Sequence, residues 1–130
     1  MTIRMLLLPM LLAGVGCSGE APPLSMATTP ERSREVLVVG FDAWKSGTTQ
    51  KDLAKQSPPI FLGDDDFYRG WKLIDYKIEG EPKVIGTGLS YVLSLTIQEP
   101  GKPAPTTRKR AYRIVTAPNI AITKEDGISP

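Results

Sequence analysis

Histidine is absent from the 130-residue sequence, and cysteine occurs once, at Cys17. Without histidine, the chain lacks the residue type that most often serves as a general base, a metal ligand or a switch near neutral pH. A single cysteine excludes an intramolecular disulfide and a cysteine metal cluster. Catalytic sites of the Ser-His-Asp and Cys-His kinds therefore cannot be built from this chain alone. We expect no catalytic residue, no metal and no other cofactor.

A strong excess of one charge is also missing. The chain has 16 Lys and Arg residues against 14 Asp and Glu residues, a net charge of +2, which does not demand a polyanionic partner. Hydrophobic residues make up 41% and charged residues 23%, as is ordinary for a globular protein. The length suits one small domain, and frequent proline and glycine between the candidate elements predict a loop-rich fold.

The N-terminus carries a compact apolar run over residues 5–12, between Arg4 and the small residues that lead to Cys17. This run is too short for a permanent membrane-spanning helix, and its basic start and small-residue end are typical of a cleaved secretory signal. We therefore predict a signal peptide over residues 1–16. Residues 17–29, rich in Ser, Pro and Thr, are expected to form a flexible tether.

Because the cysteine stands at that junction, the leader resembles a bacterial lipoprotein signal peptide. Val15 and Gly16 fit the lipobox, while Gly14 stands where the pattern has an aliphatic residue. The resemblance implies that Cys17 is diacylated, becomes the mature N-terminus and anchors the protein to a membrane of the cell envelope. Ser18, rather than Asp, follows Cys17 and favours the outer membrane over the inner. The alternative is an ordinary secretory signal with an incidental cysteine.

Strict alternation of apolar and polar residues from Gly88 to Gln98, GLSYVLSLTIQ, is the most regular pattern in the chain. It indicates a half-buried antiparallel strand, which we take as the central strand of a sheet. Thr29 and Pro30 form a helix start, and an apolar stripe follows at helical spacing. We expect helices over residues 30–46 and 50–56, and further strands over 60–62, 71–79, 83–85, 107–116 and 119–123.

The candidate ligand-binding residues lie on the expected strand over residues 71–79, where Ile74, Tyr76 and Ile78 alternate on one face. Trp71, Asp75 and Tyr76 are placed to line a pocket in the mouth of the fold. No pair of carboxylates has a spacing that points to a reaction.

Two charged runs are expected in solvent. Asp64, Asp65 and Asp66 read as a polar turn without the ligand spacing of a calcium loop, so we assign them no metal. The basic residues from Arg108 to Arg113 divide between two faces of a strand. We expect a solvated basic edge that blocks strand addition, and no nucleic-acid binding. An extracytoplasmic polyanion site is the alternative for this run.

These elements predict an α+β domain over residues 30–123, with an N-terminal helix packed on a curved antiparallel sheet of three to five strands, and a frayed tail over 124–130. Their order resembles the cystatin-like and nuclear-transport-factor-like rolls and small bacterial lipoproteins that contain such domains. The Gln-x-Val-x-Gly hairpin of inhibitory cystatins is absent. We expect a non-enzymatic, lipid-anchored envelope module that binds another protein. The alternative is a small-ligand pocket, perhaps weakly catalytic.

Overall fold

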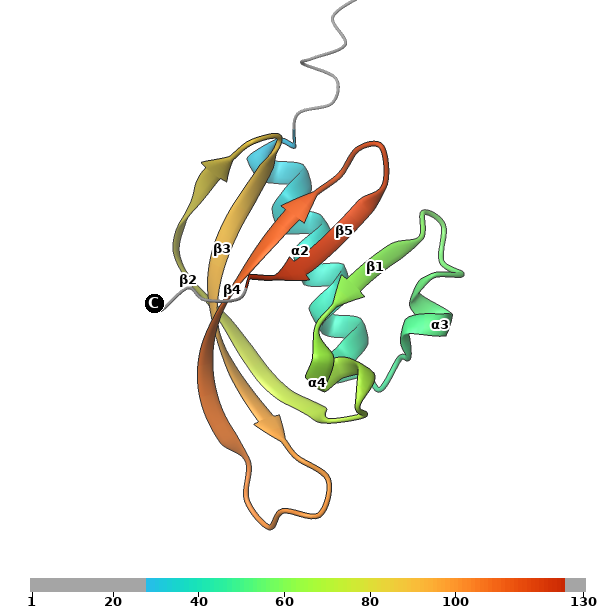
Figure 1. Cartoon of the computed structure of the whole chain (residues 1–130), viewed down its shortest axis with the longest axis vertical. Coiled ribbons are helices and arrows are strands. Elements are labelled where there is room, and N and C mark those ends of the chain that lie inside the picture. The colour runs from blue at the N-terminus through green and yellow to red at the C-terminus, as the bar shows by residue number, and fades with distance from the viewer. Residues whose placement is uncertain (1–27, 126–130) are drawn as a thin grey trace, which may run out of the picture.

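The structure, a computed structural model, describes residues 28–125 as an α+β fold with one five-stranded mixed sheet (Figure 1). The predicted signal peptide, Cys17, residues 18–27 of the tether and residues 126–130 of the tail lie outside the described residues. The elements in chain order are α2 (Pro30–Lys45), α3 (Gln50–Leu53), β1 (Ile60–Gly63), α4 (Asp65–Tyr68), β2 (Lys72–Ile85), β3 (Gly88–Gln98), β4 (Thr106–Val115) and β5 (Ile120–Lys124).

The strand order is β1-β5-β4-β3-β2, and β1 pairs with β5 in parallel while the other neighbours are antiparallel. The prediction of a wholly antiparallel sheet is therefore wrong at one edge. Parallel partners need a long connection, and here β2, β3 and β4 all lie between the two strands in the chain. The alternating strand β3 lies inside the sheet, next to β4, which holds the middle position.

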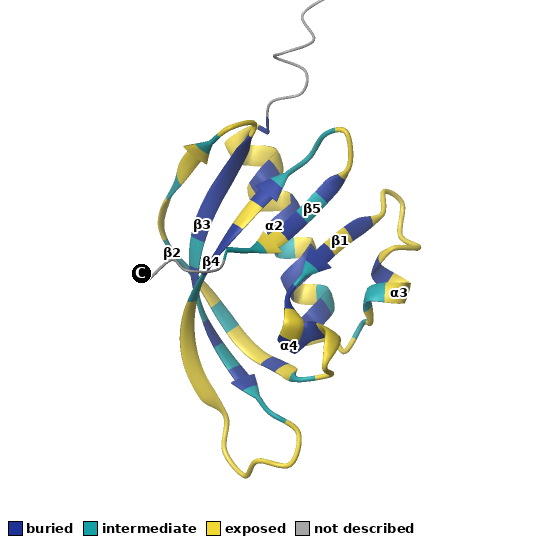
Figure 2. Ribbon diagram, viewed as in Figure 1, coloured by how far each residue is buried: buried dark blue, intermediate teal, exposed yellow. Residues whose placement is uncertain are grey.

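The core side of β3 is the one that its alternation predicts. Five side chains on that side are at most 3% exposed: Leu89, Tyr91, Leu93, Leu95 and Ile97. Helix α2 packs against the sheet, with the rings of Phe41 and Tyr112 edge to face at 4.9 Å and a 2.7 Å hydrogen bond between the Ser33 and Tyr91 hydroxyls. Figure 2 marks the buried residues of α2 and of the strands in dark blue. As predicted, Thr29 caps the helix at its start, and its hydroxyl accepts from the backbone N–H of Arg32.

Strand β2 departs from its predicted alternation at Ile74, which is 46% exposed. The pairing with β3 shifts between Leu73 and Asp75, so Ile74 is an extra residue in a bulge and Leu73 takes the buried position. The bulge therefore inverts the predicted faces of the residues up to Ile74, whereas Tyr76 and Ile78 keep the core side that alternation assigns to them. A second shift, between Glu79 and Lys83, falls at the predicted break, and β2 continues through it to Ile85.

Both ends of the described chain belong to the fold. The Thr28 N–H donates to the Thr87 carbonyl at 3.0 Å, and the Thr28 hydroxyl accepts from the Thr116 N–H at 3.1 Å. Lys124 is the last residue of β5, and the Glu125 N–H donates to the Ala111 carbonyl at 2.8 Å. The described fold thus includes residues 28, 29, 124 and 125, which flank the predicted range 30–123.

Two short helices differ from the sequence-based expectation. Helix α3 begins as predicted, with the Thr49 hydroxyl accepting from the Asp52 N–H, but ends at Leu53 rather than at residue 56. Helix α4 was not predicted at all. Asp64 caps it, and its carboxylate accepts from the Asp66 N–H at 2.8 Å. An Asp at such a position is a common helix start.

Candidate functional site

The expectation that the acidic run lies in solvent is wrong, because Asp64 and Asp66 are only 2% and 6% exposed. The guanidinium of Arg110 lies 3.1 Å from Asp64 and 2.5 Å from Asp66, and the Tyr112 hydroxyl donates to Asp64. Arg110 and Tyr112 are two residues apart on β4, so both face the core side of the sheet. The four side chains form one buried charged cluster.

The cluster is internally satisfied. Burial raises the pKa of Tyr112, and the charge of Asp64 and its hydrogen bond raise it further. Burial alone would lower the pKa of Arg110, but the hydrogen bond to Asp66 and the charges of Tyr112 and Asp64 raise it. Across residues 28–125, every buried side-chain nitrogen and oxygen has a hydrogen-bond partner. Within the same range, no group of three or more Asp, Glu, Cys or His side chains is placed to hold a metal ion. Its contacts join the start of α4 to β4.

The basic run does not form one surface either. The Arg108 guanidinium lies 5.7 Å from the ring centroid of Trp71, Arg110 is in the buried cluster, and Arg113 lies 3.7 Å from the carboxylate of Glu125. The predicted division between two faces is confirmed, but the solvated interpretation is wrong for Arg110, whose side chain is only 11% exposed. A continuous polyanion site along β4 is not supported by this arrangement.

The buried cluster positions one wall of an open cleft. It holds α4 against β4, and the backbone carbonyl of Asp66 accepts from the Trp71 N–H at 3.0 Å. Gly70, at φ +82°, makes the turn between α4 and β2. This geometry carries Phe67, Tyr68 and Trp71 to the same side. The opposite wall is the end of α2 and its turn into α3, where Gly47 adopts φ +88°.

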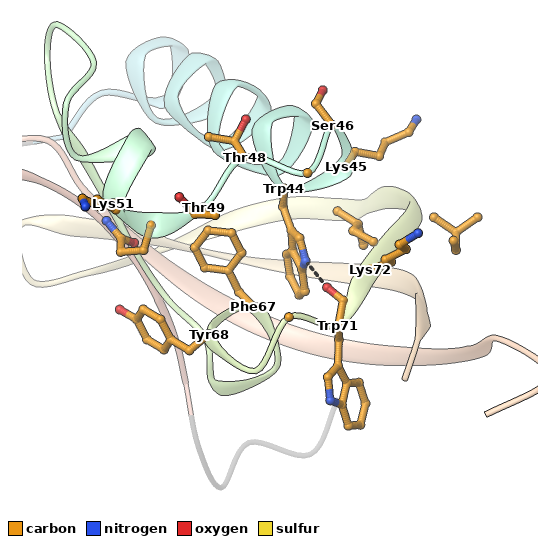
Figure 3. Close-up of a pocket in the computed structure, with 15 residues that line it drawn as sticks. Trp44, Lys45, Ser46, Thr48, Thr49, Lys51, Phe67, Tyr68, Trp71 and Lys72 are labelled. Atoms are coloured by element: carbon orange, nitrogen blue, oxygen red, sulfur yellow. Dashed lines mark hydrogen bonds between the residues drawn. The ribbon is translucent and has the colours of Figure 1, made fainter. Parts of the chain in front are cut away.

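The cleft has a volume of about 820 Å³ (Figure 3). Its first wall contributes Trp44, Lys45, Ser46, Gly47, Thr48, Thr49, Gln50 and Lys51, and its second wall contributes Phe67, Tyr68, Gly70, Trp71, Lys72, Leu73 and Ile74.

Aromatic rings form the middle of the cleft. The indole N–H of Trp44 donates to the Trp71 carbonyl at 2.8 Å and so ties the two walls together. The Trp44 ring meets that of Phe67 at 5.5 Å, and Phe67 is followed by Tyr68, with 5.9 Å between their centroids. Trp44 and Phe67 are buried, Trp71 is half-buried and Tyr68 is 49% exposed. The exposure of the aromatic residues therefore increases from Trp44 and Phe67, which are buried, to Tyr68, which is exposed.

Lysine provides all of the formal charge among the lining residues. Lys45, Lys51 and Lys72 are exposed, and neither Asp nor Glu lines the cleft. Lys45 lies 3.6 Å from Asp75, an ion pair in which both side chains are well exposed.

Of the three residues predicted to bind a ligand, Trp71 lines the cleft, whereas Asp75 and Tyr76 do not. Asp75 pairs with Thr96 on the face of β2 opposite to Tyr76, and its side chain is 72% exposed. Tyr76 donates to the Asp42 carboxylate at 2.8 Å and packs on Phe41 at 5.4 Å between ring centroids. Burial, followed by the hydrogen bond to Asp42, raises the pKa of Tyr76.

Sequence reasoning missed the cleft because Trp44 and Phe67 are separated along the chain and both belong to the core. Trp44 belongs to the apolar stripe of the predicted helix over residues 30–46, which accounts for its burial, but one part of its side chain also faces the cleft. Only the clustering of aromatic residues from Phe67 to Trp71 marks this region in the sequence.

Comparison of the chain with protein family models, with curated proteins and with solved structures finds no significant match. Among residues 28–125, no helix is long and apolar enough to cross a membrane. The function of the cleft is therefore inferred from its own residues.

Proposed function

We propose that this protein is a non-enzymatic binding module of the bacterial cell envelope, anchored by an acylated Cys17, and that its cleft binds another protein. The observation that carries the proposal is the open aromatic surface between α2 and β2. Tyr68 is 49% exposed and Trp71 half-buried, although burial of such rings is favourable. Tyrosine and tryptophan are the residue types that most often dominate the energy of protein interfaces.

The chemistry of the cleft supports binding rather than catalysis. Its lining contains no carboxylate to act as a general acid or base. The nearest buried carboxylates, Asp64 and Asp66, are engaged by Arg110. The chain also lacks histidine, as the sequence shows.

The position of the cleft suits a module that is anchored at its N-terminus. Ten residues lie between Cys17 and Thr28, and the eleven steps from one to the other span up to about 39 Å in an extended chain. Helix α2 then adds a length of about 24 Å for its 16 residues. The cleft lies at the far end of this helix, beyond Lys45. In an anchored molecule, it can therefore stand clear of the membrane and face a protein partner.

The finer fold assignment is part of the proposal. We infer that α2 covers the concave face of a curved sheet, as in the cystatin-like and nuclear-transport-factor-like rolls. Contacts of α2 with β1, β2, β4 and β5 support this arrangement. A roll of this kind leaves its open end available for binding, and here the cleft lies at the end of α2.

The test is purification of the native protein from its own envelope in mild detergent, followed by mass spectrometry of the protein and its companions. We expect a diacylated Cys17 and a stoichiometric companion that is lost from Trp71→Ala. That variant keeps the backbone carbonyl to which Trp44 donates, so the walls stay joined. Val84→Ala removes an exposed apolar side chain at the other end of β2 and is the matched control.

Two outcomes would contradict the proposal separately. An unmodified, freely soluble protein would remove the lipid anchor. A companion that Trp71→Ala retains as well as Val84→Ala does would remove the cleft as its binding site.

A small-ligand site is the second candidate function. The cleft volume of about 820 Å³ lies within the usual range for small-molecule pockets. An acylated protein that is purified without a companion, but with a small molecule that Trp71→Ala releases, would favour this alternative.

A further inference from the structure

The cleft has a charge of one sign although the chain as a whole is nearly neutral. Its lining includes Lys45, Lys51 and Lys72 and no acidic residue, whereas the full sequence has 16 basic and 14 acidic residues. The local excess of positive charge is therefore a property of this surface and does not follow from the composition. Charge complementarity favours a negatively charged occupant.

The three lysines lie at two opposite ends of the aromatic surface. Figure 3 shows Lys51 on one side of the rings of Trp44 and Phe67, and Lys45 and Lys72 on the other. The Arg108 guanidinium, 5.7 Å from the centroid of the Trp71 ring, adds positive charge beside the second wall. An occupant that satisfies both ends needs negative groups separated by an apolar part. An extended peptide meets this requirement more readily than a compact small molecule does.

The lysines are available to such an occupant. Among residues 28–125, Lys51 and Lys72 form no ion pair. The pair between Lys45 and Asp75 has side chains 43% and 72% exposed and a separation of 3.6 Å. Pairs of this kind contribute little to stability and can exchange for a better partner.

We propose that the cleft takes an extended acidic segment of the partner protein, with a large apolar side chain on the aromatic surface and carboxylates on both sides of it. The inference rests on the proposed function, because it assumes that the cleft binds a protein. It adds the chemistry of the recognised segment. The apolar side chain packs among Phe67, Tyr68 and Trp71, and the flanking carboxylates meet Lys51 at one end and Lys72 at the other.

The two tryptophans of the chain, Trp44 and Trp71, both line the cleft, so intrinsic tryptophan fluorescence reports binding there. The full chain in detergent is titrated with three peptides that lack tryptophan. They are acetyl-Glu-Asp-Phe-Asp-Glu-amide, its neutral analogue acetyl-Gln-Asn-Phe-Asn-Gln-amide, and acetyl-Glu-Asp-Ala-Asp-Glu-amide without the aromatic ring. We expect a saturable change with the first peptide, and weaker binding of the other two.

Charge reversal tests the roles of the lysines. The double variant Lys51→Glu/Lys72→Glu should weaken binding of the acidic phenylalanine peptide by about tenfold or more. Lys83→Glu, an exposed reversal on the distant half of β2, should leave it unchanged. Raising the salt concentration from about 0.1 M to about 0.5 M should also weaken binding, because exposed charge pairs are screened.

Equal affinity for the neutral and acidic peptides would overturn the inference, as would no saturable binding of the acidic peptide. Tighter binding of sodium benzoate, or of vesicles that contain phosphatidylglycerol, would assign the cleft to a small carboxylate or to a lipid surface. If the native companion still depends on Trp71 in any of these cases, the cleft remains a protein-binding site and only its acidic specificity fails. A companion independent of Trp71 would instead contradict the proposed function itself.

Discussion

Arg110 on β4 forms an ion pair with Asp64, whose side chain is fully buried, with 3.1 Å between Nη1 and Oδ2. This pair connects two segments that are 46 residues apart in the chain. It fixes the start of α4, which carries Phe67 and Tyr68 into the cleft. The surface proposed to bind a partner therefore depends on a charged cluster beneath it.

Removing the charge of Asp64 should destabilise the protein strongly. Asp64→Asn keeps the shape of the side chain but leaves Arg110, only 11% exposed, without one of its two carboxylates. We expect a loss of about 1–3 kcal/mol, because a buried charged group loses one hydrogen-bonded partner while Arg110 keeps its pair with Asp66. Chemical denaturation measures this loss.

The neighbouring Asp65 provides the matched control. It is exposed, and Asp65→Asn should change the free energy of unfolding by no more than about 0.5 kcal/mol. Equal effects of the two substitutions would show that the ion pair is not what holds α4.

Stability should also fall at high pH because of Tyr112. Burial and then Asp64 raise the pKa of Tyr112 above its ordinary value of 10.0. The unfolded chain releases this proton near pH 10 while the folded chain retains it, so the contribution is complete below about pH 10 and is lost as the pH rises further. The free energy of unfolding, measured from neutral pH upward, should begin to fall near this pH.

Tyr112→Phe removes that ionisation and should make the fall shallower. It should also cost about 1–2 kcal/mol at neutral pH, because Asp64 loses a buried hydrogen bond. Tyr76 and Tyr68, whose pKa values are raised chiefly by burial, account for part of the remaining slope. A pH dependence identical to that of the unsubstituted chain would contradict this assignment.

The outer edge of β1 is closed by the side chain of Gln50. Its amide nitrogen donates to the Ile60 carbonyl at 3.2 Å, and its amide oxygen accepts from the Leu62 N–H at 2.9 Å. Without Gln50, these backbone groups would lie unpaired at the strand edge. Gln50→Ala should therefore speed hydrogen exchange at Leu62 and lower the free energy of unfolding by about 1 kcal/mol. Gln56→Ala, a change at an exposed position after α3, is the control, and unchanged exchange at Leu62 in Gln50→Ala would refute the role.

The elements that the sequence predicts well are those with local signals. The cap at Thr29 and the alternation in β3 depend on residues close together in the chain, and both are confirmed. The parallel pairing of β1 with β5 has no local signal, since 56 residues separate the last residue of β1 from the first of β5. An antiparallel sheet was therefore expected at that edge.

The buried cluster and the cleft were beyond prediction for the same reason. Asp64 looks like a turn residue and Arg110 like a surface residue until the fold brings them together. Trp71 was identified as a candidate for binding and lines the cleft. Asp75 and Tyr76 are neighbours on β2, so their side chains point to opposite faces of the sheet: Asp75 lies in solvent, Tyr76 packs on Phe41, and neither lines the cleft.

The most direct test of the binding surface is photo-crosslinking in intact cells, with a photoreactive amino acid at single positions of the full chain. Thr48 lines the cleft, and Lys83 is an exposed position at the other end of the sheet. We expect one discrete crosslinked product from position 48, lost when Trp71→Ala is added, and no such product from position 83. The same product from both positions, or one that persists with Trp71→Ala, would contradict the assignment of the cleft as the binding site.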